Sequence, residues 1–166
     1  MTTSLMIRKN WNIMLATDKK SSGWHEWLYE NETKIHWNLM EWERLIIVNS
    51  WDSRIEDIYI EALKEYNKEV NVWDKLHNLI TYMNKFNTEF ECIIYDEKIN
   101  RAFRINTNFD IEEIKEYCFI GSWAKYAQAI YKYDTESDIV SLTKKIFETV
   151  SKIDIFTGKD FNCILI

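Results

Sequence analysis

The hydrophobic period of the sequence changes several times along the chain, and these changes constrain the fold most. Short segments in which apolar residues alternate or run together are typical of strands. In the first third of the chain these segments are residues 3–8, 13–17, 34–39 and 44–48. Four residues separate the first segment from the second, and four separate the third from the fourth, which predicts two hairpins. From residue 53 onward the apolar residues recur three and four positions apart, and this spacing predicts amphipathic helices over 53–67 and 72–83.

The second half of the sequence repeats this order of strands followed by helices. Its segments, in order, are a third hairpin of 90–95 and 101–105, an apolar run at 117–120, helices near 124–131 and 139–150, and a final strand at 161–166. Thr135 or Ser137 is placed to cap the last helix. Because strands and helices come in separate blocks, the sequence predicts an α+β fold with sheets covered by helices, and not alternating βαβ units.

No linker signal divides the chain. The sequence of 166 residues has no proline and three glycines, and it contains no Ser/Gly-rich or single-sign stretch. No repeat of about 20 to 50 residues is visible, which argues against solenoids and propellers. A chain of this length can bury one adequate core. We therefore expect one domain over residues 1–166.

Charge and hydropathy exclude two classes of partner. The 21 basic residues are dispersed among 27 acidic ones, for a net charge of −6, whereas nucleic-acid binding needs basic side chains gathered on one face. No segment approaches the ~18 uncharged apolar residues that a membrane-spanning helix needs. The first residues lack the order and length of a signal peptide. We expect a cytoplasmic protein that binds neither nucleic acid nor membrane.

The metal-ligating residue types show no ligand spacing. The three cysteines and three histidines are widely separated, without a Cys-x-x-Cys pair. These residues are Cys92, Cys118, Cys163, His25, His36 and His77. The cysteines lie among apolar neighbours and are expected to be buried thiols. No metal and no cofactor are expected.

Tryptophans are concentrated near the first strands. Five of the eight fall in one short stretch, at Trp24, Trp27, Trp37, Trp42 and Trp51. Such a cluster can form a platform for a carbohydrate or peptide. Large aromatic residues also fill cores and subunit interfaces, where Trp and Tyr are enriched, and we favour this second interpretation.

Several short motifs follow one another along the chain. They are Thr2-Thr3-x-x-x-x-Arg8-Lys9-Asn10, Ala16-Thr17-Asp18, Lys34, Ile120-Gly121-Ser122 with Tyr126-Ala127-Gln128, and Asp154-Ile155-Phe156-Thr157-Gly158. In order and spacing they resemble the proteasome β-subunit family, and in particular its HslV-like N-terminal nucleophile hydrolases. The resemblance covers nearly the whole chain. It implies a four-layer αββα sandwich, and two of the three glycines, Gly121 and Gly158, fall at family motif positions.

The resemblance also implies a threonine-dependent peptidase whose nucleophile is Thr2. Methionine before a small residue is commonly removed, and Thr2 would then carry both a hydroxyl and an α-amine. An α-amine titrates near 7.7 to 8, so it can accept the hydroxyl proton directly or through a water. This is the N-terminal threonine variant of acyl transfer through an ester intermediate.

The other motif residues take supporting roles in the same resemblance. Lys34 is expected to place its ammonium beside the Thr2 hydroxyl, and Asp18 to pair with Lys34. The residues expected to orient the threonine amine are Ser122, Asp154 and Thr157. Taken singly, each has an ordinary alternative as a turn residue, an edge charge, a helix cap or a surface carboxylate.

The sequence departs from the family beside the expected nucleophile. Where the family has a glycine-rich turn that supplies the oxyanion amide, this chain has Asn49-Ser50-Trp51-Asp52-Ser53. A backbone N–H remains whatever the side chain, and such a donor contributes about 3 to 4 kcal/mol to a transition state. Trp51 or Asp52 is expected to fill or reshape the substrate groove, and Trp123 replaces another family glycine.

Two functions from different classes follow from this pattern. The first is a peptidase that acts on peptides or unfolded proteins inside a homo-oligomeric ring, hexameric or heptameric and single or stacked, with an ATPase unfoldase as a partner. The alternative is a catalytically degenerate subunit with a structural or partner-binding role. A different amide-bond chemistry on the same scaffold is a third option, because fold does not fix substrate.

Overall fold

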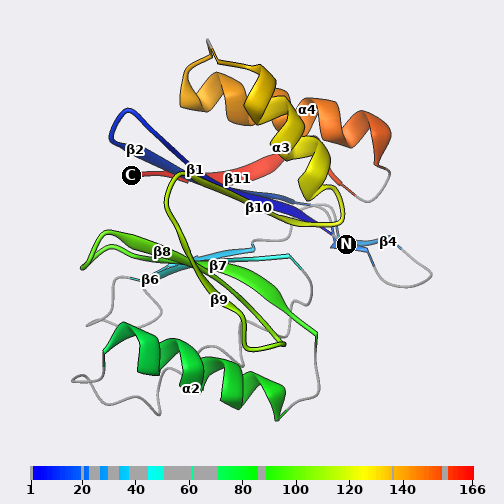
Figure 1. The fold of residues 1–166 in the computed structure, drawn as a ribbon. Helices are drawn as coiled ribbons and strands as arrows, with labels where there is room; N and C mark the ends of the chain where they lie inside the picture. Colours follow the sequence, from blue (N-terminus) through cyan, green and yellow to red (C-terminus); the bar gives the residue numbers. More distant parts are fainter. Residues whose placement is uncertain are drawn as a thin grey trace.

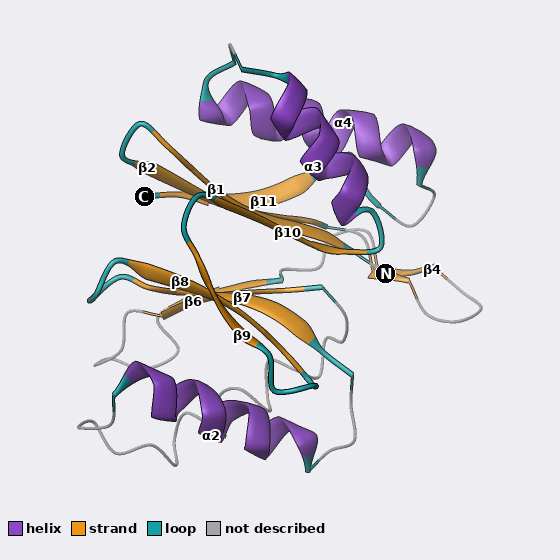
Figure 2. Cartoon of the chain, viewed as in Figure 1, coloured by secondary structure: helices purple, strands orange, loops and turns teal. Residues whose placement is uncertain are grey.

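A computed structural model of the chain describes residues 2–19, 21–22, 27–29, 34–37, 45–50, 61, 71–85, 89–135, 137–154 and 157–166. Two antiparallel sheets lie face to face, and helices cover the outer face of each (Figures 1 and 2). The order of layers is helix, sheet, sheet, helix. This is the predicted α+β sandwich.

The first sheet contains the N-terminal hairpin at its centre, in the order β10-β1-β2-β11. Its strands are β1 (Thr3–Lys9), β2 (Asn12–Asp18), β10 (Tyr117–Gly121) and β11 (Phe161–Leu165). Asn10 and Trp11 form the two-residue turn between β1 and β2, with φ angles of 51° and 72°. Two positive φ values match the twist of paired strands, which explains so short a turn.

The second sheet has the order β5-β6-β7-β8-β9. Its strands are β5 (Ile35–Trp37), β6 (Leu45–Asn49), β7 (Glu91–Asp96), β8 (Arg101–Asn106) and β9 (Ile111–Ile114). The two hairpins predicted here are confirmed. Three strands were not predicted: β9, and the separate pair β3 (Ser21–Ser22) and β4 (Trp27–Tyr29). They are short, and pairing with a neighbouring strand holds them in place more than their own composition does.

Three described helices form the outer layers. Helix α2 (Val72–Asn84) covers the second sheet, while α3 (Ala124–Tyr133) and α4 (Ile139–Ile153) cover the first (Figure 1). All three were predicted. The helix predicted over 53–67 lies outside the described residues, apart from the helical residue Glu61.

The N-cap of α4 differs from the prediction. The capping residue is Asp138, whose carboxylate accepts hydrogen bonds from the backbone N–H groups of Val140 and Ser141. Thr135 lies three residues and Ser137 one residue before this position. Ser137 instead donates its hydroxyl to Asp134, so a second carboxylate orders the connection before the helix.

Strand β6 shows how the layers are held together. Leu45 and Ile47 pack in the cluster beneath α2, whereas Ile46 and Val48 pack in the cluster between the sheets. Side chains alternate between the two faces of a strand, so an uninterrupted apolar run is buried on both sides. The same rule divides β1, where Leu5 packs toward α4 and Met6 toward the other sheet.

The structure tests the expectation that the three cysteines are buried, but not the interpretation of the tryptophan cluster. Cys92 is buried and Cys118 is half-buried, but Cys163 is exposed, so the expectation of three buried thiols is wrong for Cys163. It lies on β11, an edge strand that presents alternate residues to solvent. The side chains of the tryptophan cluster at 24–51 lie outside the described part of the chain.

The described residues contain no group of three or more metal-ligating side chains. None of the helices in the described ranges is long and apolar enough to cross a bilayer.

Candidate active site

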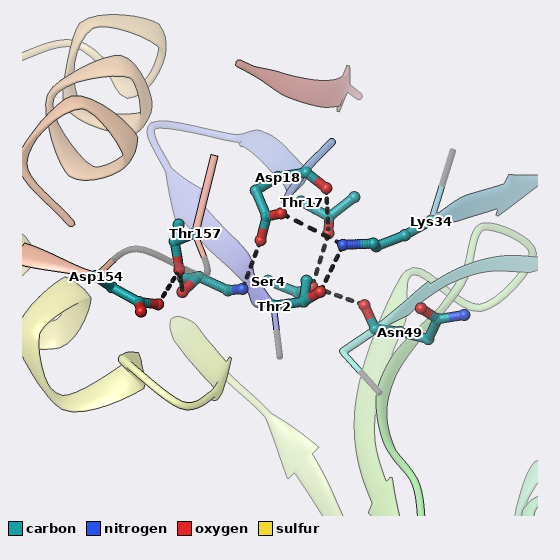
Figure 3. A network of polar contacts seen from close by, with 9 residues as sticks. Thr2, Ser4, Thr17, Asp18, Lys34, Asn49, Asp154 and Thr157 are labelled. Atoms are coloured by element: carbon teal, nitrogen blue, oxygen red, sulfur yellow. Dashed lines mark hydrogen bonds and ion pairs between the residues drawn. The ribbon is translucent and has the colours of Figure 1, made fainter. Parts of the chain in front are cut away.

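The centre of the candidate site is a contact between Thr2 and Lys34, which come from different sheets. Thr2 immediately precedes β1 in the first sheet, and Lys34 immediately precedes β5 in the second. The Lys34 Nζ donates a hydrogen bond of 2.5 Å to Thr2 Oγ1 (Figure 3). Only 4% of Thr2 and 6% of Lys34 are exposed. A buried ammonium beside a hydroxyl stabilises negative charge on that oxygen.

Asp18 supplies the negative charge that this ammonium needs. It is the last residue of β2 and is fully buried. Its Oδ1 lies 3.3 Å from Lys34 Nζ, and its Oδ2 accepts a 2.7 Å hydrogen bond from the Thr3 backbone N–H. A buried cation is tolerated only when it is paired and hydrogen-bonded. Asp18 therefore neutralises Lys34 and also holds the peptide that follows Thr2.

A second hydrogen-bonded chain begins at Thr3 and runs toward helix α4. The Thr3 and Thr157 hydroxyl oxygens are 3.1 Å apart, and Thr157 Oγ1 donates to Asp154 Oδ2 over 2.6 Å (Figure 3 shows Thr157 and Asp154). Since Thr157 uses its proton on the carboxylate, Thr3 donates to Thr157. Asp154 is the C-cap residue of α4. The chain thus ties the start of β1 to the end of this helix, and its first member, Thr3, was not predicted as a site residue.

The structure brings Ser122 neither into the contacts around Lys34 nor into the hydrogen bonds that run from Thr3 to Asp154. Ser122 is exposed, in the turn between β10 and α3, and makes no hydrogen bond to another described residue. Its sequence position beside Gly121 put it in the predicted set. Proximity along the chain did not determine where its hydroxyl points.

Gly121 brings two backbone segments together next to Thr2. It pairs with Thr3 in the β1–β10 register and has a φ of 97°. A Cβ atom on residue 121 would lie 1.8 Å from the Thr2 carbonyl oxygen. Only glycine fits this approach. The Gly121 N–H donates to the Glu91 carboxylate over 3.3 Å.

Only the beginning of the turn expected to form the oxyanion site is described. Asn49 and Ser50 are buried, whereas Trp51 and Asp52 lie outside the described residues. The backbone N–H and the hydroxyl of Ser50 both donate to the Glu91 carbonyl, over 3.3 and 3.2 Å. The Ser50 amide is therefore already used.

Trp123, the other departure from the family, packs on the helical side of the first sheet. It is half-buried against the cluster formed with α3 and α4, and its ring lies 4.6 Å from that of Tyr126 between centroids. This contact gives the large side chain a structural role at the start of α3.

Cys118 lies on β10, paired with Met6 of β1, and is not a competing nucleophile. Burial raises the pKa of its thiol to about 12, against a weaker opposite effect of Arg104. The thiolate is the reactive form of cysteine, so Cys118 stays protonated and inert at neutral pH.

Comparison with known proteins identifies the fold. No family model matches the sequence, and no curated protein matches it. Solved structures do match over nearly the whole chain. They include HslV from Trypanosoma brucei, with a TM-score of 0.80 at 15% identity, covering 99% of this chain and 98% of that one.

Two further structures agree with this likeness. BPH from Thiobacillus denitrificans in complex with epoxomicin has a TM-score of 0.74 at 12% identity, covering 99% of this chain and 98% of that one. Anbu, an ancestral β-subunit, from Yersinia bercovieri has a TM-score of 0.79 at 13% identity, covering 99% and 81%. The chain has the proteasome-type fold of N-terminal nucleophile hydrolases.

Proposed function

We propose that this protein is a threonine peptidase that cleaves amide bonds with Thr2 after removal of Met1. The observation that carries the proposal is the Lys34 ammonium, 2.5 Å from Thr2 Oγ1 and paired with Asp18. A hydroxyl buried against a cation at the start of a chain is arranged for nucleophilic attack. The shared fold with HslV and BPH supports the same assignment.

In the proposed reaction, the freed Thr2 amine takes the hydroxyl proton, directly or through a water. The Thr2 oxygen then attacks the carbonyl carbon of the substrate, and the amide nitrogen leaves as an amine after it receives that proton. A water next hydrolyses the resulting ester and restores the hydroxyl. Lys34 stabilises the attacking oxygen, and Asp18 keeps Lys34 charged and in place.

The remaining site residues orient the start of β1. The chain from Thr3 through Thr157 to Asp154 fixes the backbone on which Thr2 is mounted. Ser122 is exposed next to Gly121, and we propose that its hydroxyl turns to the amine that loss of Met1 creates. Trp51 and Asp52 are proposed to shape the substrate groove, with an oxyanion amide from the same turn.

The proposal extends to assembly. We propose that residues 1–166 form one domain and that six or seven copies assemble into a homo-oligomeric ring in the cytoplasm. The proposed substrates are peptides or unfolded proteins, and the proposed partner is an ATPase unfoldase. The likeness to HslV and to the β-subunit Anbu supports the ring. Light scattering checks the ring, because a mass of 20.2 kDa would identify a monomer.

A second candidate function is a degenerate subunit of the same fold that binds partners without cleaving them. The replacement of the expected glycine-rich turn by Asn49-Ser50-Trp51-Asp52-Ser53 favours it. A bulky turn at that position would close the groove while leaving the rest of the sandwich intact.

Intact mass measured before and after incubation with epoxomicin separates the two candidates. Epoxomicin is the compound in the BPH complex. A peptidase would show loss of Met1 and addition of one epoxomicin per chain, and a Thr2→Ala variant would show no addition. A chain that retains Met1 and gains no adduct would be the degenerate subunit.

A further inference from the structure

Two buried hydroxyls face the second sheet from the N-terminal hairpin. Ser4 on β1 pairs with Thr17 on β2, and both are fully buried. The next residue on the same face of β1, Met6, belongs to the apolar cluster between the sheets. Hydroxyls at such a position need hydrogen-bond partners, because burying them unpaired is costly.

Ser4 finds its partner on the opposite sheet. Its Oγ donates to the Asn49 carbonyl oxygen at the end of β6 over 2.8 Å (Figure 3). The Thr17 hydroxyl oxygen lies 2.9 Å from Ser4 Oγ. Ser4 Oγ is placed to donate to the Asn49 carbonyl or to the Thr17 hydroxyl oxygen, and Thr17 Oγ1 itself donates to the Asp18 carbonyl oxygen over 3.4 Å. The Ser4–Asn49 bond links the first sheet to the second.

The backbone of Asn49 extends this link to Lys34. The Asn49 N–H donates a hydrogen bond to the Lys34 carbonyl oxygen over 3.3 Å. Ser4 is two residues from Thr2, so one hydrogen-bonded path joins the backbones that carry the hydroxyl and the ammonium. The apolar contacts between the sheets are non-directional and do not set a position to a fraction of an ångström. The Ser4–Asn49 bond is directional and joins the two sheets beside Lys34.

We propose that Ser4 is a positioning residue that sets the distance between Lys34 and Thr2 through the Asn49 peptide. The inference rests on the proposed function for its catalytic consequence, but its geometric part stands apart from activity. Without the Ser4 hydroxyl, β5 and the Lys34 ammonium shift relative to β1. The contacts of Lys34 with Thr2 and Asp18 then weaken.

The first test measures the rate at which Thr2 reacts with epoxomicin. Ser4→Ala is expected to lower the maximal inactivation rate about tenfold while leaving the half-saturating concentration unchanged, because displacement of a catalytic group reduces rate more than binding. Thr143→Val removes another buried hydroxyl, which donates within α4, and should leave the rate unchanged.

The second test needs no activity. It is a double-mutant cycle of Ser4→Ala and Lys34→Met, read as the equilibrium constant for unfolding in urea. If Ser4 positions Lys34, losing the Ser4 hydroxyl should destabilise the protein less when residue 34 is already Met. The change in the unfolding constant of the double variant should then be roughly threefold to tenfold smaller than the product of the changes in the two single variants. The cycle of Thr143→Val with Lys34→Met is the control. In it, the change in the unfolding constant of the double variant should equal the product of the two single changes to within about twofold.

The outcomes are distinguishable. A wild type that does not react with epoxomicin ends the proposed function, and the cycle alone then decides on Ser4. An unchanged inactivation rate in Ser4→Ala, or a cycle as additive as its control, overturns the positioning role. If Ser4→Ala unfolds below the assay temperature, Ser4→Cys replaces it; this variant keeps a weak donor, and its effect should be smaller than that of Ser4→Ala.

Discussion

Gly121 and Thr2 approach so closely that the backbone of one leaves no room for a side chain on the other. A Cβ atom at residue 121 would lie 1.8 Å from the Thr2 carbonyl oxygen, and the φ of 97° disfavours any other residue type. The carbonyl of Thr2, the proposed nucleophile, therefore packs against bare backbone. Any substitution here has to move the start of β1, on which Thr2 is held.

Gly121→Ala should consequently destabilise the protein and misplace Thr2. A strained φ alone costs about 1 to 3 kcal/mol, and the clash with the Thr2 carbonyl adds to it. Urea unfolding should show a loss of at least about 2 kcal/mol in the free energy of unfolding. The neighbouring exposed substitution Ser122→Ala is the control, with an expected change within about 0.5 kcal/mol. Equal stability of the two variants would contradict the close approach.

Replacing Thr2 tests the nucleophile directly. Thr2→Ala removes only a hydroxyl and a methyl group, so it should fold and assemble like the wild type while losing hydrolysis of a fluorogenic peptide and addition of epoxomicin. Thr2→Ser keeps the hydroxyl and the amine and should retain part of both. Peptide hydrolysis that survives in purified Thr2→Ala would rule out the assigned mechanism.

Lys34 has a structural and a chemical role, and two variants separate them. Lys34→Met removes the ammonium that lies 3.3 Å from the buried Asp18 carboxylate, which should cost about 3 to 5 kcal/mol in the free energy of unfolding. Adding Asp18→Asn removes the negative charge of that pair as well and should recover most of the stability. Reactivity with epoxomicin should stay lost in both.

Lys125→Met, on the exposed face of α3, is the matched control for Lys34→Met and should change neither stability nor reactivity. Recovery of reactivity in the Lys34→Met, Asp18→Asn double variant would show that the ammonium is not required for the chemistry.

The cap of α4 predicts an acid-dependent change in stability. Hydrogen bonds from Ser141 and Val140 lower the pKa of Asp138 below its usual 3.8. A carboxylate with a depressed folded-state pKa stabilises the fold above pH 3.8, and that contribution is lost as the pH falls through the folded-state value. The melting temperature of Asp138→Asn should therefore fall less between pH 5 and the acid limit than that of the wild type. Thr135→Ala, at the position first expected to cap, should follow the wild type at every pH.

The three cysteines should differ in their reaction with iodoacetamide. Cys163 is exposed, Cys92 is buried, and burial raises the pKa of Cys118 to about 12. In the folded protein at pH 8, peptide mapping should find the label on Cys163 alone, and in 8 M urea on all three residues. Rapid labelling of Cys118 in the folded state would contradict its burial on β10.

The spacing of apolar residues was sufficient to predict the hairpins and the described helices, because periodicity and turns are properties of neighbouring residues. It was insufficient for β9, whose sequence Ile-Glu-Glu-Ile carries little strand signal, and for the α4 cap. Pairing of β9 with β8 decided the first case, and it is an interaction that no single segment contains. Competition among adjacent polar residues, which residue-type preference alone does not resolve, decided the second.

The sequence alone determined the α+β order of elements and the presence of Thr2, Asp18 and Lys34 at the ends of predicted strands. Only the tertiary structure decided that these ends meet, that Thr3 belongs to the network, and that Ser122 points to solvent. Periodicity specifies which face of a strand is buried. The distance between side chains from two different sheets depends on how the sheets pack, and that is set by contacts between residues far apart in the chain.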